Sequence, residues 1–147
     1  MAVFHSRSAA ETKKLGRRIA LEVLRRKKKR IIALRGDLGS GKTAFAKGFF
    51  SELGIKRRIS SPTFVLIKKF PLKFRDFKEA YHIDCYRIAK AKNLAEIGLR
   101  AALKNPSAIF LIEWADLAKN ILPLLETEWM YFENGAKENE RIITQTN

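Results

Sequence analysis

The sequence predicts an α/β fold with three layers, in which helices cover both faces of a mixed, mainly parallel sheet. Short apolar runs that are typical of buried strands alternate with longer segments whose apolar residues recur at helical spacing. The last two strand-like runs, 128–132 and 141–145, flank the turn residues Asn134 and Gly135 and predict an antiparallel C-terminal portion. At this length and with 46% hydrophobic residues, we expect one domain over residues 1–147.

The first predicted helix covers residues 9–27. Ser8 and Glu11 form a capping-box pattern at its start, in which each side chain accepts a hydrogen bond from a free backbone N–H near the other. The predicted inner face consists of Leu15, Ile19, Val23 and Leu24. Six cations follow at 25–30. We interpret them as a solvated helix end whose charges suit the helix dipole, and nucleic-acid contact is the alternative.

The remaining elements follow from the same periodicities. We expect a buried strand at 31–34 and a helix from Lys42 to Leu53 that Gly54 terminates. The inner face of this helix is expected to consist of Phe45, Phe49, Phe50 and Leu53. Further strands are predicted at Phe64–Phe70, Tyr81–Arg87 and Ala108–Ile112, and shorter helices at Asn93–Leu103 and Ala115–Ile121.

A phosphate-binding pattern, GDLGSGKT at residues 36–43, lies between the 31–34 strand and the following helix. Its glycines let the backbone point N–H groups at a phosphate, and the start of the helix adds its positive dipole end. Lys42 is expected to reach the outer phosphates and the Thr43 hydroxyl to hold Mg²⁺. This context favours a P-loop NTPase-like fold over an ordinary glycine turn. The expected nucleotide-binding residues are Asp37, Leu38, Gly39, Ser40, Gly41, Lys42, Thr43 and Ala44.

Two carboxylates are candidates for completing a hydrolytic site. Glu113 follows five apolar residues, which places it at the carboxyl end of a buried strand, where ligands bind in open α/β sheets. Asp84 lies among apolar residues on another strand, where a carboxylate is costly unless it is paired. We favour a role for Asp84 near Mg²⁺ or the attacking water over an ion pair with Arg87, and we interpret His82 as a packed strand histidine. The catalytic candidates are Asp84, Glu113 and Lys42, and the metal candidates are Thr43 and Glu113.

Three further features are the segment 60–63, Trp114 and Cys85, and the first two have two interpretations each. The hydroxyl-rich segment 60–63 is interpreted either as a switch-like loop over the nucleotide, with Ser61 and Thr63 as its functional residues, or as a polar turn. Trp114 is interpreted as an aromatic at the edge of the core, with contact to the nucleotide or a partner as the alternative. Cys85 is the single cysteine, so we expect a buried free thiol.

The charge balance is strongly positive, with 30 Lys and Arg against 15 Asp and Glu. Such an excess favours contact with nucleic acid or another polyanion, although an acidic partner protein or a lysine-rich proteome gives the same net charge. No apolar run approaches the roughly 18 residues that a membrane span requires, and the N-terminus lacks a signal-like apolar stretch. We therefore expect a cytoplasmic protein with no membrane contact.

Six segments then occur in a characteristic order: SAAETKKLGRRIA, GDLGSGKTAFAKGF, SPTFVL, YHIDCYRI, EIGL and LIEWAD. Together they resemble the TsaE (YjeE) family, the small P-loop ATPases of bacterial tRNA threonylcarbamoyladenosine synthesis, over about residues 8–144. The resemblance implies Mg²⁺-dependent hydrolysis of ATP alongside the partners TsaB and TsaD. The complex would modify adenosine 37 of tRNAs that read codons starting with A. Contact with tRNA would be indirect or through the basic surface.

The resemblance also implies roles for single residues. It implies that Lys42 binds phosphate and that Thr43 and Glu113 bind the metal. It also implies that Asp84 is a catalytic carboxylate and that Thr63 belongs to a switch-like loop. Thr12, and with it Ser8, lies in the N-terminal segment that approaches the nucleotide in this family, so Thr12 joins the expected ATP-binding residues. The segment 89–93 lacks the acidic stretch that is common in the family. This departure concerns expected partner contacts and leaves the ATP site unaffected.

Two other functions compete with this hypothesis. A small-molecule kinase would need an acceptor pocket and a lid, for which 147 residues leave little room. A basic RNA-binding module with a regulatory nucleotide site would follow from the net charge of +15. The aromatic residues are spaced as core stripes, which argues against a surface for stacking RNA bases.

Overall fold

The computed structural model describes residues 1–56, 67–86 and 93–146. The strands are β1 (Ala2–Ser6), β2 (Ile31–Arg35), β3 (Ile67–Pro71), β4 (Glu79–Asp84), β5 (Ala108–Glu113), β6 (Thr127–Asn134) and β7 (Arg141–Thr146). The helices are α1 (Ala9–Arg26), α2 (Lys42–Glu52) and α4 (Asn93–Leu103), with 3-10 turns η1 (Ala115–Ala118) and η2 (Leu124–Glu126). No helix in the described part of the chain has the length and apolar character needed to cross a membrane.

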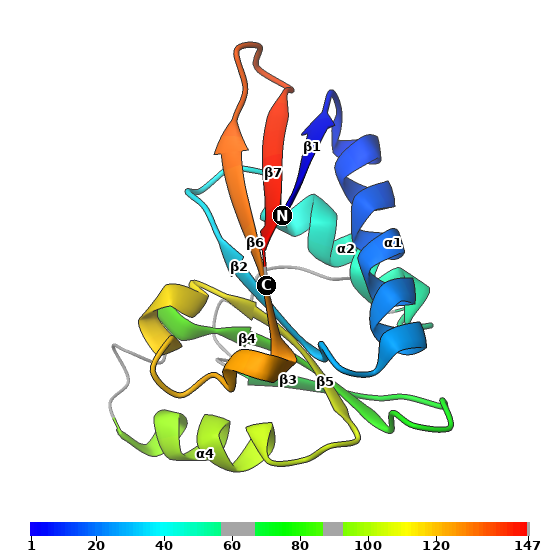
Figure 1. Ribbon diagram of the computed structural model, residues 1–147, viewed down its shortest axis with the longest axis vertical. Coiled ribbons are helices and arrows are strands. Elements are labelled where there is room, and N and C mark those ends of the chain that lie inside the picture. The colour runs from blue at the N-terminus through cyan, green and yellow to red at the C-terminus, as the bar shows by residue number, and fades with distance from the viewer. Residues whose placement is uncertain (57–66, 87–92, 147) are drawn as a thin grey trace.

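One seven-stranded sheet, in the order β1-β7-β6-β2-β5-β4-β3, forms the middle layer (Figure 1). Strands β6, β2, β5 and β4 run parallel to one another. The pairs β1–β7, β6–β7 and β3–β4 are antiparallel. The predicted α/β fold with a mixed sheet and an antiparallel C-terminal portion is therefore confirmed, including the β6–β7 hairpin.

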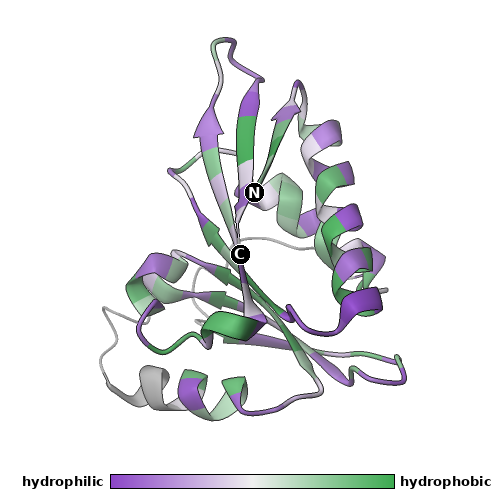
Figure 2. Cartoon of the chain, viewed as in Figure 1, coloured by the Kyte–Doolittle hydropathy of each residue, from purple (hydrophilic) through white to green (hydrophobic). Residues whose placement is uncertain are grey.

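Two apolar layers cover the two faces of the sheet. α1 and α2 pack over one face, where Phe45, Phe49 and Phe50 are fully buried, as predicted. α4 and η1 pack over the other face, with Leu99 and Ala115 in the core. β2 and β5 are accordingly apolar on both sides over most of their length, and Figure 2 shows them mostly in green. A parallel sheet that is covered on both faces explains why β2 and β5 read as continuous apolar runs.

The N-terminal strand β1 is the element that the sequence analysis missed. It pairs antiparallel with β7 at the edge of the sheet, and its burial alternates along the strand. Phe4 is its only large apolar side chain packed against the core. A strand this short, with one inward anchor, has too weak a period-2 pattern to be recognised without its partner strand.

Two predicted boundaries were wrong. β4 ends at Asp84 rather than at 87, and residues 85–86 are helical. Instead of the helix predicted at Ala115–Ile121, the chain forms only the four-residue 3-10 turn η1. β4 ends where the Asp84 side chain accepts a hydrogen bond from Tyr86 N–H, and η1 follows the left-handed backbone of Trp114; helix and strand propensity does not reveal either turn. Residues 64–66 and Arg87 of the predicted strands lie outside the described residues.

The ends of α1 follow local rules. Ser8 Oγ accepts a hydrogen bond from Glu11 N–H at 3.1 Å, and Glu11 Oε2 accepts one from Arg7 N–H at 2.7 Å. The helix ends at Lys27, whose left-handed backbone (φ 60°) lets its N–H bond to Val23 O at 2.9 Å. The capping box places the start of α1 firmly, and the helix then runs along α2.

α1 and α2 approach each other at two glycines. A Cβ atom added to Gly16 would lie 2.1 Å from Phe45 O, and one added to Gly48 would lie 1.8 Å from Lys13 O. Neither distance is possible without moving a backbone. The close approach holds α2 against α1 and so fixes the direction in which the first turn of α2 points.

Gly48→Ala is therefore expected to destabilise the fold by about 1–3 kcal/mol, because the new methyl group overpacks the α1–α2 contact. Gly98→Ala is the matched control, since Gly98 is also helical and nothing lies within 4 Å of an added Cβ atom. It is expected to stabilise the protein by up to about 1 kcal/mol through helix propensity. Urea unfolding of both variants measures the two free energies; equal effects would contradict the packing argument.

Candidate nucleotide-binding site

Three parallel strands end side by side at the carboxyl edge of the sheet. In the register of β4 and β5, Asp84 lies opposite Glu113. In the register of β2 and β5, Leu34 lies opposite Glu113. The loop that starts at Gly36 therefore begins next to both carboxylates. Topology alone brings together residues that are 29 and more positions apart in the sequence.

The loop from residue 36 to residue 41 leads from β2 into α2 and depends on its glycines. Gly39 (φ 75°) and Gly41 (φ 102°) have left-handed backbones, which glycine adopts at no steric cost. Gly36 lies against β6, because an added Cβ atom would come within 2.8 Å of Phe132 O. Gly41 is also the N-cap of α2. The free N–H groups of this helix start therefore face the same space as the carboxylates.

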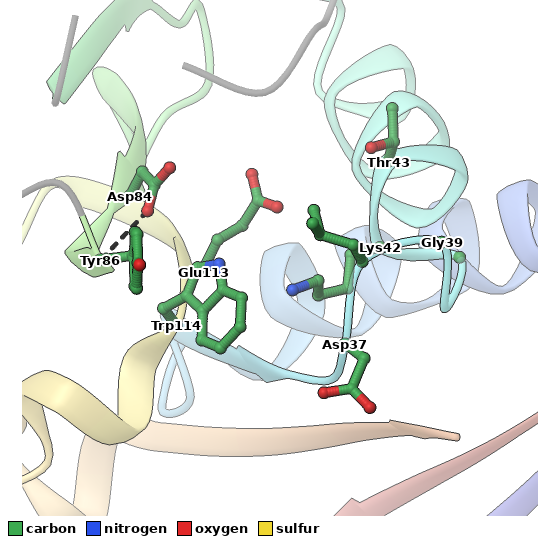
Figure 3. Close-up of a pocket in the computed structure, with 10 residues that line it drawn as sticks. Asp37, Gly39, Lys42, Thr43, Asp84, Tyr86, Glu113 and Trp114 are labelled. Atoms are coloured by element: carbon green, nitrogen blue, oxygen red, sulfur yellow. Dashed lines mark hydrogen bonds between the residues drawn. The ribbon is translucent and has the colours of Figure 1, made fainter. Parts of the chain in front are cut away.

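A cavity of about 790 Å³ opens at this edge (Figure 3). It is lined by Asp37, Leu38, Gly39, Gly41, Lys42, Thr43, Asp84, Tyr86, Glu113 and Trp114. In Figure 3 the carboxylates of Asp84 and Glu113 face Lys42 and Thr43 across the space between the strands and α2. The structure thus brings together all the residues that the sequence analysis predicted as catalytic or metal-binding.

The Lys42 side chain is held inside this cavity and is only 6% exposed. Its ammonium group donates a hydrogen bond to Gly36 O and lies 4.4 Å from the centroid of the Trp114 ring. Burial lowers the pKa of Lys42, while the negative charges of Glu113 and Asp84 act in the opposite direction. The cation has no direct carboxylate partner in the described structure, so it is available to an incoming anion.

Glu113 is held by a neighbour on the next strand. His82 Nε2 lies 2.8 Å from Glu113 Oε2, and both side chains are buried. The ring of His82 also packs against Phe50 at 5.2 Å between centroids. Because a carboxylate only accepts hydrogen bonds, Nε2 donates to it. The interpretation of His82 as a packed strand histidine is confirmed, but the sequence did not reveal its contact with Glu113.

Asp84 ends β4 and is 8% exposed. Its Oδ1 accepts a hydrogen bond from Tyr86 N–H at 3.1 Å, which turns the chain after the strand. The other carboxylate oxygen, Oδ2, faces the cavity with Glu113 (Figure 3). The neighbouring Cys85 points the other way and is a buried free thiol, as predicted, with its pKa raised by burial to about 12.

Trp114 shapes the wall of the cavity. Its backbone is left-handed (φ 54°, ψ 39°), a conformation that costs a non-glycine residue about 1–3 kcal/mol. The turn stops β5 directly after Glu113 and places the indole ring against Lys42 and, at 5.3 Å, against the ring of Tyr86. Backbone strain of this kind concentrates at functional sites. Trp114 is therefore part of the cavity wall as well as an aromatic at the edge of the core.

Other predicted residues lie behind the loop or outside the described part. Ser40 is buried, and Thr12 is buried with its hydroxyl 2.7 Å from Ser6 Oγ. Thr12 Cγ2 lies 3.5 Å from the position of a Cβ atom on Gly41, so Thr12 supports the loop from behind. Ala44, on the first turn of α2, is half-buried and is not among the lining residues. Ser61, Thr63 and the segment 89–92 lie outside the described residues.

Arg141 is a site residue that the sequence analysis missed. It begins β7, and its Nη2 donates a hydrogen bond to Gly39 O at 2.8 Å. Its Nη1 donates to Glu138 O and Glu140 O. The side chain thereby ties the end of the β6–β7 hairpin to the tip of the phosphate-binding loop. No local motif signals this contact, because the two residues are 102 positions apart.

The donor set suits a nucleotide that binds together with a divalent cation. In the described residues no three His, Cys, Asp or Glu side chains are grouped so as to hold a metal. Mg²⁺ is commonly held by one or two carboxylates together with substrate phosphates and water. Thr43 and Glu113, with Asp84 beside them, provide such a partial set next to the lysine and the backbone N–H groups. The site therefore fits a magnesium–triphosphate complex better than a metal alone.

The chain is similar to proteins of one family over most of its length. A family model described as "Threonylcarbamoyl adenosine biosynthesis protein TsaE" matches residues 6–143. The chain is 33% identical over 119 residues to a "tRNA threonylcarbamoyladenosine biosynthesis protein TsaE" of Haemophilus influenzae, covering 80% of this chain and 72% of that protein. It is 36% identical over 121 residues to the protein of the same description from Bacillus subtilis, covering 79% and 68%.

A solved structure gives the same result for the fold. The crystal structure of YdiB from Bacillus subtilis superposes with a TM-score of 0.73 and 30% sequence identity, over 98% of this chain and 83% of that chain. The sequence resemblance, the register of the strands and these matches agree over nearly the whole chain. The chain belongs to the TsaE family of threonylcarbamoyladenosine biosynthesis proteins.

Proposed function

We propose that this protein is a Mg²⁺-dependent ATPase that supports the N6-threonylcarbamoyl modification of adenosine 37 in tRNA, acting in the cytoplasm together with TsaB and TsaD. The observation that carries the proposal is that Asp84 and Glu113 face Lys42 and Thr43 within one cavity. The relatives from Haemophilus influenzae and Bacillus subtilis are described as tRNA threonylcarbamoyladenosine biosynthesis proteins, which supports the pathway.

Binding would use the loop and the start of α2. The backbone N–H groups of residues 39–43 would donate hydrogen bonds to the phosphate oxygens, and the helix dipole would add to the attraction. Lys42 leaves Gly36 O and the Trp114 ring and pairs with the outer phosphates. This exchange is favourable because a buried cation gains an anionic partner that it lacks without nucleotide.

Hydrolysis would use the two carboxylates. Thr43 and Glu113 would hold Mg²⁺, which supplies charge neutralisation on the phosphate oxygens. Asp84 lies beside Glu113 in the cavity lining and would hold the attacking water. Water then attacks the γ-phosphorus, and the bond to the ADP oxygen breaks. His82 acts as a positioning residue, because its hydrogen bond fixes one oxygen of Glu113.

The structure favours this function over the two alternatives. A kinase requires a second site for its acceptor next to the phosphates, whereas the described wall opposite the loop is occupied by Trp114 and Tyr86. A module that only binds RNA has no use for two buried carboxylates opposite a buried lysine. Burying such groups is costly, and a ligand that carries phosphates and a divalent cation gives this arrangement a use.

The ATPase proposal predicts phosphate release from MgATP without any added acceptor. Asp84→Ala and Glu113→Ala are each expected to lower hydrolysis by at least about a hundredfold, the low end for a positioned catalytic group. Release of inorganic phosphate is measured for the protein alone and with the TsaB–TsaD pair, because P-loop enzymes that rely on partners can be slow alone.

Glu138→Ala is the matched control, since the Glu138 carboxylate is exposed in the β6–β7 turn and does not line the cavity, and the substitution keeps the backbone oxygen that Arg141 contacts. It is expected to keep the wild-type rate. Wild-type rates in both cavity variants would remove Asp84 and Glu113 from the mechanism. A strict requirement for a small-molecule acceptor would show a kinase instead.

The role of His82 is tested by two substitutions. His82→Leu removes the donor to Glu113. It is expected to raise the Mg²⁺ concentration needed for half-maximal hydrolysis by about 10–100-fold, because the loss of a supporting hydrogen bond lowers metal affinity by that factor. His82→Gln keeps an N–H donor at a similar reach and is expected to restore most of the activity. Thermal unfolding of both variants separates positioning from folding. Equal losses with Leu and Gln would show that His82 only fills space.

A further inference from the structure

The positive charge of this protein is concentrated at its N-terminal end. Eleven of the 30 Lys and Arg residues, but only two of the 15 acidic residues, lie in residues 1–30. This fifth of the chain therefore carries more than half of the net charge of +15. Most of it lies on α1 and on the turn that leads from α1 into β2.

The cations of α1 form a row on its outer side. Lys14, Arg17 and Arg25 are exposed and lie opposite the buried side of the helix, and Lys28 is exposed in the turn that follows. We call these four residues the α1 basic face. At 1.5 Å per residue, Lys14 and Arg25 are about 16 Å apart along the helix. Figure 2 shows hydrophilic purple along α1 and on its last turn.

These four side chains have no acidic partner within salt-bridge distance among the described residues. Two nearby cations do have acidic partners: Arg18 contacts Glu22 at 3.6 Å, and Lys27 contacts Asp76 at 2.6 Å. Lys29 is likewise occupied, since its ammonium group donates to Thr127 O at 3.0 Å. The chain thus neutralises or anchors Arg18, Lys27 and Lys29, and leaves the four residues of the α1 basic face without an ion pair among the described residues.

Helix stability does not account for the row. Cations in the last turn of a helix interact favourably with its dipole, and this explains Arg25. Lys14 and Arg17 lie in the first half of α1, where the dipole gives no such benefit. Like charges three or four residues apart destabilise a helix by a few tenths of a kcal/mol. A ligand that carries negative charge would remove this repulsion.

The chemistry of the face favours a polyphosphate over a protein. Interfaces between proteins have a core of apolar and aromatic side chains. Leu21, at 42% exposure, is the one exposed large apolar side chain of α1. A row of Lys and Arg without such a core is suited to the regularly spaced phosphates of a nucleic acid.

We propose that the α1 basic face binds the phosphate backbone of RNA. The choice of RNA over other polyanions rests on the proposed role in tRNA modification, but the binding itself requires no ATP hydrolysis. None of the four residues lines the nucleotide cavity, and Lys14 and Arg17 border a separate groove between α1 and β1. RNA and nucleotide can therefore bind at the same time.

The test compares the wild type with a fourfold variant, Lys14→Gln, Arg17→Gln, Arg25→Gln and Lys28→Gln. Glutamine keeps good helix propensity, so α1 is expected to remain folded. Binding of fluorescently labelled bulk tRNA is followed by anisotropy at several salt concentrations. Four lost phosphate contacts are expected to reduce the slope of log affinity against log salt by about 3.

The matched control changes four exposed lysines that lie outside α1, and so alters the net charge equally: Lys73, Lys104, Lys119 and Lys137 to Gln. It is expected to keep the wild-type slope. Equal losses in the two variants, or no tRNA binding by the wild type, would overturn the proposal. The proposal would also be overturned if the fourfold variant lost binding to anionic phospholipid vesicles but kept its tRNA binding. That result would assign the α1 basic face to a membrane surface.

Phosphate release from MgATP is measured in the same preparations. The fourfold variant is expected to hydrolyse ATP like the wild type, because its substitutions lie outside the cavity. Hydrolysis absent from both proteins even with the TsaB–TsaD pair added, together with a tRNA affinity that depends on the α1 basic face, would contradict the proposed ATPase and support the RNA surface. If the fourfold variant kept both its ATP hydrolysis and its tRNA binding, the result would support the proposed ATPase and contradict the RNA surface.

Discussion

The site depends on one constraint, which is the parallel register of β4, β5 and β2. This register sets Asp84 opposite Glu113, and Glu113 opposite Leu34, so that three strand ends meet where the phosphate-binding loop begins. A shift of β4 or β5 by one residue would turn the carboxylate of that strand to the other face of the sheet. The apolar layers on both faces prevent such a shift, because it would expose their buried side chains.

The electrostatics of the cavity follow from the same arrangement. Lys42 is buried near two carboxylates yet bonds only to a backbone oxygen and an aromatic ring in the described structure. Glu113 is in turn held by His82. Charges that are desolvated but not directly paired interact strongly with a ligand, since little water has to be displaced. The fold thus holds these charged groups in place around the cavity in the absence of a ligand.

Much of the fold and of the candidate site was predictable from the sequence, because many of its features depend on residues that are close together in the chain. The glycine-rich loop, the strand before it and the Glu113 position follow from short patterns, because strand burial and helix starts leave local signatures. The contacts of Arg141 with Gly39 and of His82 with Glu113 were not predictable. They join residues from different strands, and only the strand order and register bring them together.

The central claim is that Lys42 exchanges protein contacts for phosphate contacts in a site completed by two carboxylates. A crystal structure with Mg²⁺ and a non-hydrolysable ATP analogue tests it most directly. The account predicts that the Lys42 ammonium group has left Gly36 O and the Trp114 ring and contacts the outer phosphates, with Mg²⁺ bound by Thr43 and Glu113. An analogue bound away from the loop, or an unmoved Lys42, would contradict it.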